Sequence, residues 1–217
     1  MPTPVIFNGA NMSETHSSKI IQNFRLLVQK GKTELFKIPY KNEELIYSLA
    51  TLLHDNKNKP VQMFLTKEDF NQLYPLLNET LNWSDTFSLI VSDDVLMNDK
   101  LTKAMPYQTD SYFNETHPCL SSLAQNNNNI KIVQLEKNEQ YSSFILTPNT
   151  HMIRFKDADA FGCCVNVRYN KKEIERMDNL RKLFQHLFER SIPFSSDLID
   201  KHMIDFTNLF PRQRTYE

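Results

Sequence analysis

Apolar residues recur at steps of three and four in several stretches, which is the spacing of one face of an α-helix. Residues 17–30 form one such stretch, and Gly31 ends it. A second stripe predicts a helix over residues 43–54, for which Asn42 can provide the N-terminal cap. The strongest helical pattern covers residues 172–190. These stretches predict amphipathic helices that each bury one side.

Short apolar runs bounded by turn residues separate these helices and predict β-strands. We expect strands at residues 33–38, 61–65, 87–91, 130–135, 144–146, 152–155 and 163–167. The Pro-Asn turn at residues 147–150 predicts a hairpin. Alternation of strand and helix in the first half is typical of crossover units, and hence of parallel pairing. The predicted architecture is an α/β fold with a mixed, mostly parallel β-sheet flanked by helices.

The remaining segments complete this plan without requiring a second domain. Further helices are expected after Thr66, at Pro118 and over residues 196–206. The chain has 217 residues and a mass of 25.6 kDa, enough to bury a core without disulfides or metals. We therefore expect one α/β domain over residues 1–217, with residues 1–16 as a loosely packed N-terminal arm.

Charge and cysteine content narrow the possible partners and compartments. Lys and Arg number 25 against 26 Asp and Glu, so the net charge is -1. Nucleic acid is an unexpected partner, because non-specific binding needs a basic surplus. The 3 cysteines include a vicinal pair, which argues against a disulfide framework and a thiolate zinc site. With no leader pattern and no long apolar run, we expect a cytoplasmic protein without a membrane span.

The order of elements in the second half resembles a known superfamily. From Ile130 to Ser191 a strand, a hairpin, another strand and a long amphipathic helix follow one another. This order is similar to that of phospholipase D-like domains, and residues 24–65 resemble the opening of the same fold. The resemblance implies a single phospholipase D-like domain.

The catalytic signature of that superfamily is absent at the positions where it should fall. The signature is His-x-Lys-x-x-x-x-Asp, in which the His attacks phosphorus and the Lys holds phosphate oxygens. Tyr141, Ser143 and Pro148 occupy its three positions. A phenol titrates near 10 and is a poor nucleophile at neutral pH, and neither Ser nor Pro supplies the missing charge. The resemblance therefore implies a non-catalytic binding or regulatory module.

A ligand site, if retained, is expected around Tyr141 and Ser143, with His151 and His117 as further candidate ligand-binding residues. Arg154 is the candidate for holding a small anionic ligand, because a guanidinium binds oxyanions in a bidentate manner. Family members place their site between two such domains, so the resemblance implies a homodimer. The alternative is a phosphodiesterase or nuclease with atypical residues, with His151 or His117 as nucleophile.

A third hypothesis is a protein–protein interaction module that binds an unknown protein through the aromatic stretch at residues 107–113. We expect no cofactor and no metal, because His54-Asp55 and Asp93-Asp94 lack metal-ligand spacing. Cys163 and Cys164 would point to opposite faces of a strand, one into the core and one out of it. We interpret both cysteines as residues that pack in the fold.

Overall fold

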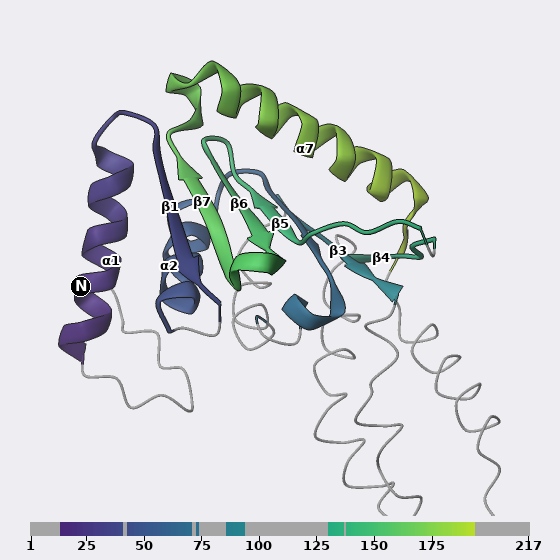
Figure 1. Cartoon of the computed structure of the whole chain (residues 1–217), viewed down its shortest axis with the longest axis horizontal. Coiled ribbons are helices and arrows are strands. Elements are labelled where there is room, and N and C mark those ends of the chain that lie inside the picture. The colour runs from purple at the N-terminus through teal and green to yellow at the C-terminus, as the bar shows by residue number, and fades with distance from the viewer. Residues whose placement is uncertain are drawn as a thin grey trace, which may run out of the picture.

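Helices cover both faces of one β-sheet in the computed structural model of the protein (Figure 1). The structure describes residues 14–40, 43–70, 73, 86–93, 130–136 and 138–193. Across these residues helix α7 (Lys171–Arg190) lies over one face of the sheet, and α2 (Glu43–Asp55) lies against the other. Helix α1 (Glu14–Gln29) packs on α2. The predicted α/β architecture, with a mixed sheet flanked by helices, is confirmed.

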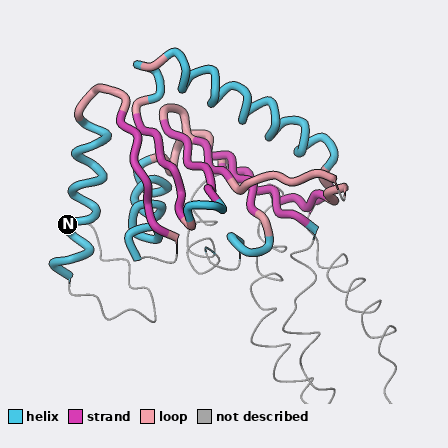
Figure 2. Tube along the Cα trace, viewed as in Figure 1, coloured by secondary structure: helices cyan, strands magenta, loops and turns pink. Residues whose placement is uncertain are grey.

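Within the described residues the sheet has 8 strands, seen as one magenta layer in Figure 2. They are β1 (Glu34–Pro39), β2 (Val61–Leu65), β3 (Phe87–Ser92), β4 (Ile130–Val133), β5 (Phe144–Leu146), β6 (Thr150–Phe155), β7 (Ala160–Val165) and β8 (Ile192–Pro193). Their order across the sheet is β1-β7-β6-β5-β2-β3-β4-β8. The predicted strands are therefore present, with shifts of a few residues at their ends.

The prediction of a mostly parallel sheet is wrong for the described strands. Only the pairs β2–β3 and β3–β4 are parallel. The pairs β1–β7, β7–β6, β6–β5, β5–β2 and β4–β8 are antiparallel. Short connections join β5 to β6 and β6 to β7, and such connections permit only antiparallel neighbours. Strand β1 pairs with β7 rather than β2, so the helix between β1 and β2 does not make a crossover between parallel neighbours.

Two main hydrophobic clusters fill the space on the two sides of the sheet, and a smaller third one joins Cys164 and Val167 to Met177 of α7. The larger cluster joins Phe24 of α1 and Leu49 of α2 to inward residues of the strands, including Cys163. The other joins Phe184 and Leu187 of α7 to the opposite face of β2–β5. Because both faces are covered, residues on either side of a central strand are buried.

Helix α7 begins at an asparagine cap. The Asn170 side chain accepts hydrogen bonds from the backbone N–H groups of Lys172 and Glu173, at 3.0 and 3.4 Å. These bonds satisfy two donors that the first turn leaves without helical partners. Of the predicted stripe, Met177, Phe184 and Leu187 are buried, whereas Ile174 is 39% exposed. The cap fixes where the first turn sits, and thereby positions Glu173 over the sheet.

The end of α1 is held against the end of β7. Gly31 has a φ of 68°, the left-handed conformation that glycine adopts without strain, so it ends the helix as predicted. Asn166 is also left-handed, and its side-chain amide donates to the Val28 carbonyl at 2.9 Å. Arg25 and Asp55 form a two-bonded ion pair between α1 and α2, so Asp55 has a structural partner.

Several expectations concern other parts of the chain. The short helices at Pro118 and 196–206 and the aromatic stretch at 107–113 lie outside the described residues. The expected arm at 1–16 overlaps helix α1, which already includes residues 14–16. Among the helices that the structure describes, none combines the length and apolar character needed to span a bilayer.

Candidate functional site

Strand β6 carries two of the predicted site residues, and they face opposite sides of the sheet. His151 lies opposite Cys164 of β7 in the strand register and contacts Glu173 of α7. Arg154, three residues on, contacts Asp69 and the ring of Tyr40 on the other side. The alternation of side chains along a strand produces this division. Two separate polar clusters result, one on each face.

The guanidinium of Arg154 is enclosed and fully engaged. It is 4% exposed, and its Nε donates to Asp69 Oδ1 at 3.3 Å and its Nη2 to Asp159 Oδ1 at 2.8 Å. Nη1 donates to the carbonyls of Phe155 and Ala160, at 3.1 and 3.4 Å. The Tyr40 ring lies 3.7 Å below the guanidinium carbon, a favourable cation–π distance. Arg154 thus joins β6 to the neighbouring segments.

Ser143 belongs to the same network. Its hydroxyl is buried and accepts a hydrogen bond from the Thr66 backbone N–H at 2.9 Å. The Thr66 hydroxyl donates to Asp69 Oδ2 at 3.2 Å, and Asp69 in turn binds Arg154. We name Ser143, Thr66, Asp69, Arg154 and Asp159 the arginine cluster. It ties the end of β2 to the start of β5 and the end of β6.

Tyr141 lies apart from that cluster, among the residues that pack under α7. Its ring meets Phe64 edge-on at 6.3 Å between centroids, and its hydroxyl donates to Glu139 Oε1 at 3.1 Å. Burial, together with Glu139, raises the pKa of Tyr141. Arg190 at the end of α7 binds Glu139 through both of its terminal nitrogens, and mainly for this reason the pKa of Glu139 falls to about 2.

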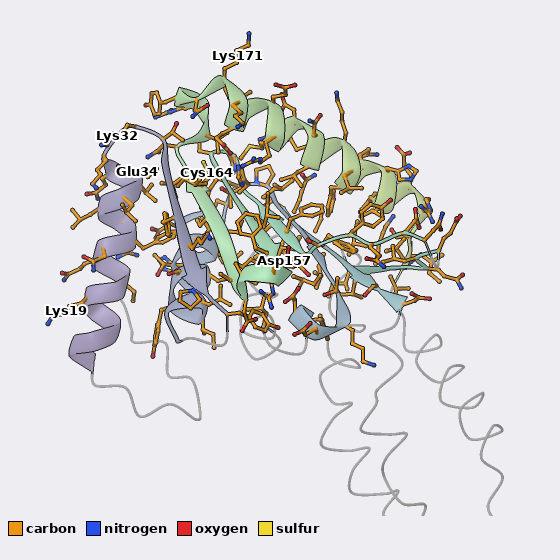
Figure 3. The ribbon with its side chains drawn as sticks, in the orientation of Figure 1. Lys19, Lys32, Glu34, Asp157, Cys164 and Lys171 are labelled. Carbon is orange, nitrogen blue, oxygen red and sulfur yellow. The ribbon has the colours of Figure 1, made fainter. Side chains whose placement is uncertain are left out.

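His151, Cys164 and Glu173 form the second cluster, named here the histidine cluster. One nitrogen, sulfur or oxygen atom from each of the three residues lies within 4.8 Å of the others. His151 Nε2 is 2.9 Å from Glu173 Oε2, and Arg176 Nη1 lies 3.1 Å from the same oxygen. All three side chains are buried. Figure 3 labels Cys164, between the sheet and the start of α7.

Burial controls the protonation of this cluster. It lowers the pKa of His151, although Glu173 acts in the opposite direction, so the imidazole is neutral at pH 7. Burial, assisted by the Glu173 charge, raises the pKa of Cys164 to about 11. Cys164 is consequently a thiol rather than a thiolate, and a thiol is a poor nucleophile.

One nitrogen of His151 has no partner. Among buried side-chain nitrogen and oxygen atoms of the described residues, Nδ1 alone lacks a hydrogen bond. Most buried polar groups in proteins are paired, so this atom calls for an explanation. The arginine cluster contains no comparable atom among its described members.

The structure groups the predicted site residues differently from the expected single pocket. Ser143 and Arg154 share one network, Tyr141 lies under α7, and His151 joins the histidine cluster. His117 lies outside the described residues. The ligand-binding role assigned to these residues stays a prediction.

Two residues of the histidine cluster were not predicted as site residues from the sequence. From the sequence alone we interpret Cys164 as a packing residue and do not single out Glu173. Both cysteines are buried, Cys163 against α2 and Cys164 under α7, so neither leaves the core. The register of the β6–β7 pair places His151 opposite Cys164, a neighbour relation that periodicity alone does not give.

Neither the family models nor the curated proteins include a match to this chain. Among solved structures, the chain is similar to TrmBL2, an archaeal chromatin protein whose structure is described as showing a novel mode of DNA binding. The two are 8% identical with a TM-score of 0.42, over 83% of this chain and 62% of that one. The chain thus spans less than two thirds of TrmBL2, and the likeness supports no functional assignment.

Proposed function

We propose that this chain is a non-catalytic binding or regulatory module with a phospholipase D-like architecture. The main support for the proposal comes from the residues that occupy the three positions of the catalytic signature. Tyr141 and Ser143 stand where a nucleophilic imidazole and a lysine would be needed, and internal hydrogen bonds to Glu139 and Thr66 engage their hydroxyls. Pro148 supplies no carboxylate. The hydroxyls of Tyr141 and Ser143 are thus engaged within the fold, and none of the three positions supplies the imidazole, amine or carboxylate of the signature.

The proposed ligand is a small anion, and Arg154 is its proposed partner. The guanidinium is buried, but one of its two carboxylate partners is Asp159, whose side chain is 66% exposed. An anion could replace that carboxylate on Nη2 while Asp69 keeps its bond to Nε. Anion binding would then require Asp159 to swing outward, which an exposed side chain can do at low cost.

Removal of the competing carboxylate tests this ligand assignment. In the variant Asp159→Asn, the affinity for inorganic phosphate and sulfate should increase over wild type, because an amide competes less well for the guanidinium. Isothermal titration of both proteins measures the change. No detectable binding by wild type and variant alike would contradict the anion assignment.

Activity assays test the absence of catalysis. Purified protein is incubated with a generic phosphodiester and with single-stranded DNA, in parallel with His151→Ala and His117→Ala. We expect no turnover by wild type above the protein-free blank. Turnover that either substitution abolishes would establish an atypical phosphodiesterase or nuclease and overturn the proposal.

A homodimer is part of the proposal, because related sites lie between two such domains. Light scattering coupled to size exclusion gives the mass directly, against 25.6 kDa for one chain. A mass near twice that value, independent of salt, supports a dimer. A single-chain mass at all concentrations tested would remove the dimer from the proposal and leave the non-catalytic assignment to the activity assays.

A further inference from the structure

The histidine cluster has a donor set that suits a metal ion. It combines an imidazole of β6, a thiol of β7 and a carboxylate of the first turn of α7. Three separate elements converge on this point, and the relevant atoms lie within 4.8 Å of one another. Within the part of the chain that the structure describes, this is the one such group.

The hydrogen bond of the imidazole shows which of its nitrogens could share an ion with Glu173. Nε2 of His151 lies 2.9 Å from Glu173 Oε2, and in the neutral ring it carries the hydrogen and donates it to this carboxylate. An ion bound by Nε2 and Glu173 would take the place of this hydrogen, and the imidazole and the carboxylate would then be joined through the ion. The ring hydrogen would move to Nδ1, which has no partner among the described residues.

The chemistry of the donors indicates which cation fits. Sulfur and imidazole nitrogen favour borderline or soft ions such as Zn²⁺, whereas Mg²⁺ and Ca²⁺ prefer oxygen ligands. We propose that His151, Cys164 and Glu173 bind one divalent ion of the zinc class beneath the first turn of α7. This inference goes beyond the proposed function and does not depend on it.

Binding would require small adjustments, and the structure indicates where. Bonds of about 2.0–2.3 Å place ligand atoms roughly 3.3–3.8 Å apart around a tetrahedral ion. His151 Nε2 and Glu173 Oε2, now 2.9 Å apart, must therefore separate slightly, and no pair of ligand atoms needs to approach by more than about 1 Å. The Cys164 proton must leave, because the metal binds the thiolate. The Glu173 carboxylate must also loosen its bonds to Arg176, which lie at 3.1 and 3.3 Å.

Arg176 therefore acts as a competitor for the ion. Its side chain is 40% exposed, and its guanidinium forms an ion pair with the Glu173 carboxylate that the ion would bind. Replacement by a neutral residue should favour metal binding in two ways, by freeing the carboxylate and by removing a nearby cation. This gives the proposal a variant that gains affinity, in addition to those that lose it.

Optical titration of the purified full chain, first stripped with a chelator, tests the proposal. Co²⁺ serves as the probe because thiolate ligation to cobalt produces a charge-transfer absorption, and Zn²⁺ is then added to displace it. We expect one ion per chain, the thiolate absorption, and a higher thermal midpoint with Zn²⁺ but not with Mg²⁺. Absence of stoichiometric binding by the wild type would overturn the proposal.

Substitutions locate the ion. The variants Cys164→Ala and His151→Asn should each lower affinity by more than the roughly 10–100-fold that loss of an outer-sphere partner costs. Cys163→Ala is the matched control, since Cys163 neighbours Cys164 but faces the opposite hydrophobic cluster. It should bind as the wild type does. Undiminished binding by a folded Cys164→Ala protein would place the ion elsewhere and overturn the proposal.

Arg176→Gln supplies a test that does not depend on a buried substitution. Because the Arg176 side chain is exposed, the variant should fold as the wild type does, and circular dichroism checks its fold. We expect the variant to bind Zn²⁺ more tightly than the wild type. Equal or weaker binding would show that Glu173 is not a ligand and would overturn the three-residue site.

Discussion

The arginine cluster and the histidine cluster lie on opposite faces of the same strand, three residues apart. In the arginine cluster a buried cation meets a buried carboxylate, an exposed carboxylate, two carbonyls and an aromatic ring. In the histidine cluster a neutral ring has one paired and one unpaired nitrogen. The first cluster satisfies its polar groups internally, and the second does not.

This difference determines what a ligand would have to displace at each cluster. A buried charge is tolerated only when paired, so the contacts of Arg154 are what its burial requires. A buried neutral imidazole carries no such requirement, yet an unpaired nitrogen lowers the stability of the folded state. An anion at Arg154 would therefore have to displace the Asp159 carboxylate, whereas the histidine cluster keeps one buried nitrogen unpaired.

Removal of Arg154 should have the largest effect. In Arg154→Met the Asp69 carboxylate, 2% exposed, loses its cationic partner, and breaking a buried pair typically costs about 3–5 kcal/mol of unfolding free energy. Urea denaturation measures it. The matched control is Asp159→Asn at the exposed end of the same guanidinium, for which we expect a loss of about 1 kcal/mol or less. Equal losses of unfolding free energy in the two variants would mean that Arg154→Met does not leave Asp69 as an uncompensated buried charge.

Replacement of His151 should cost much less. His151→Leu loses a hydrogen bond to Glu173, but it also removes the buried Nδ1 that has no partner. These contributions oppose each other at about 1–3 kcal/mol each, so the unfolding free energy should change by no more than about 1 kcal/mol. Glu173 retains Arg176. A loss as large as that of Arg154→Met, measured in the same urea series, would refute the contrast between the clusters.

The exposed Glu139–Arg190 pair should give the smallest effect, limited to acid. Arg190 is the main cause that lowers the pKa of Glu139 from 4.5 to about 2, so the folded state holds this proton less tightly than the unfolded chain. Its stabilisation is present above pH 4.5 and disappears as the pH falls from 4.5 to about 2. Thermal midpoints of wild type and Glu139→Gln should therefore converge across that interval.

A matched substitution separates this effect from general acid sensitivity. Glu175→Gln removes an exposed carboxylate from α7 without touching the Glu139–Arg190 pair. It should leave the acid dependence of the thermal midpoint close to that of wild type. If Glu139→Gln gave the same curve as Glu175→Gln, the ion pair would contribute nothing specific.

The periodicity of the chain was sufficient to predict most elements. The helical pattern over residues 172–190 predicted α7, and the short apolar runs predicted β2 and the β5–β6 hairpin. The direction of pairing was predicted less well, because periodicity reports which side of a strand is buried and not which strand lies next to it. The pairing of β1 with β7 depends on residues more than 100 positions apart in the chain.

The candidate sites show the same limit. Arg154 was predicted as an anion-binding residue from its chemical type, but Asp69 and Asp159 were not expected as its partners. His151 was considered as a nucleophile, and its partners Cys164 and Glu173 come from elements whose relative position depends on the whole sheet. A residue type indicates which chemistry is available, whereas its neighbours determine whether that chemistry is already used.

By itself the sequence determined the helices, the strands and the identity of the residues at the motif positions, because spacing and side-chain type are local properties. Only the tertiary structure decided that the two faces of β6 would carry different clusters, one with its buried polar atoms paired and one with Nδ1 of His151 unpaired. The physical reason is that pairing and burial depend on groups distant in sequence, which packing of α7 and α2 on the sheet brings together.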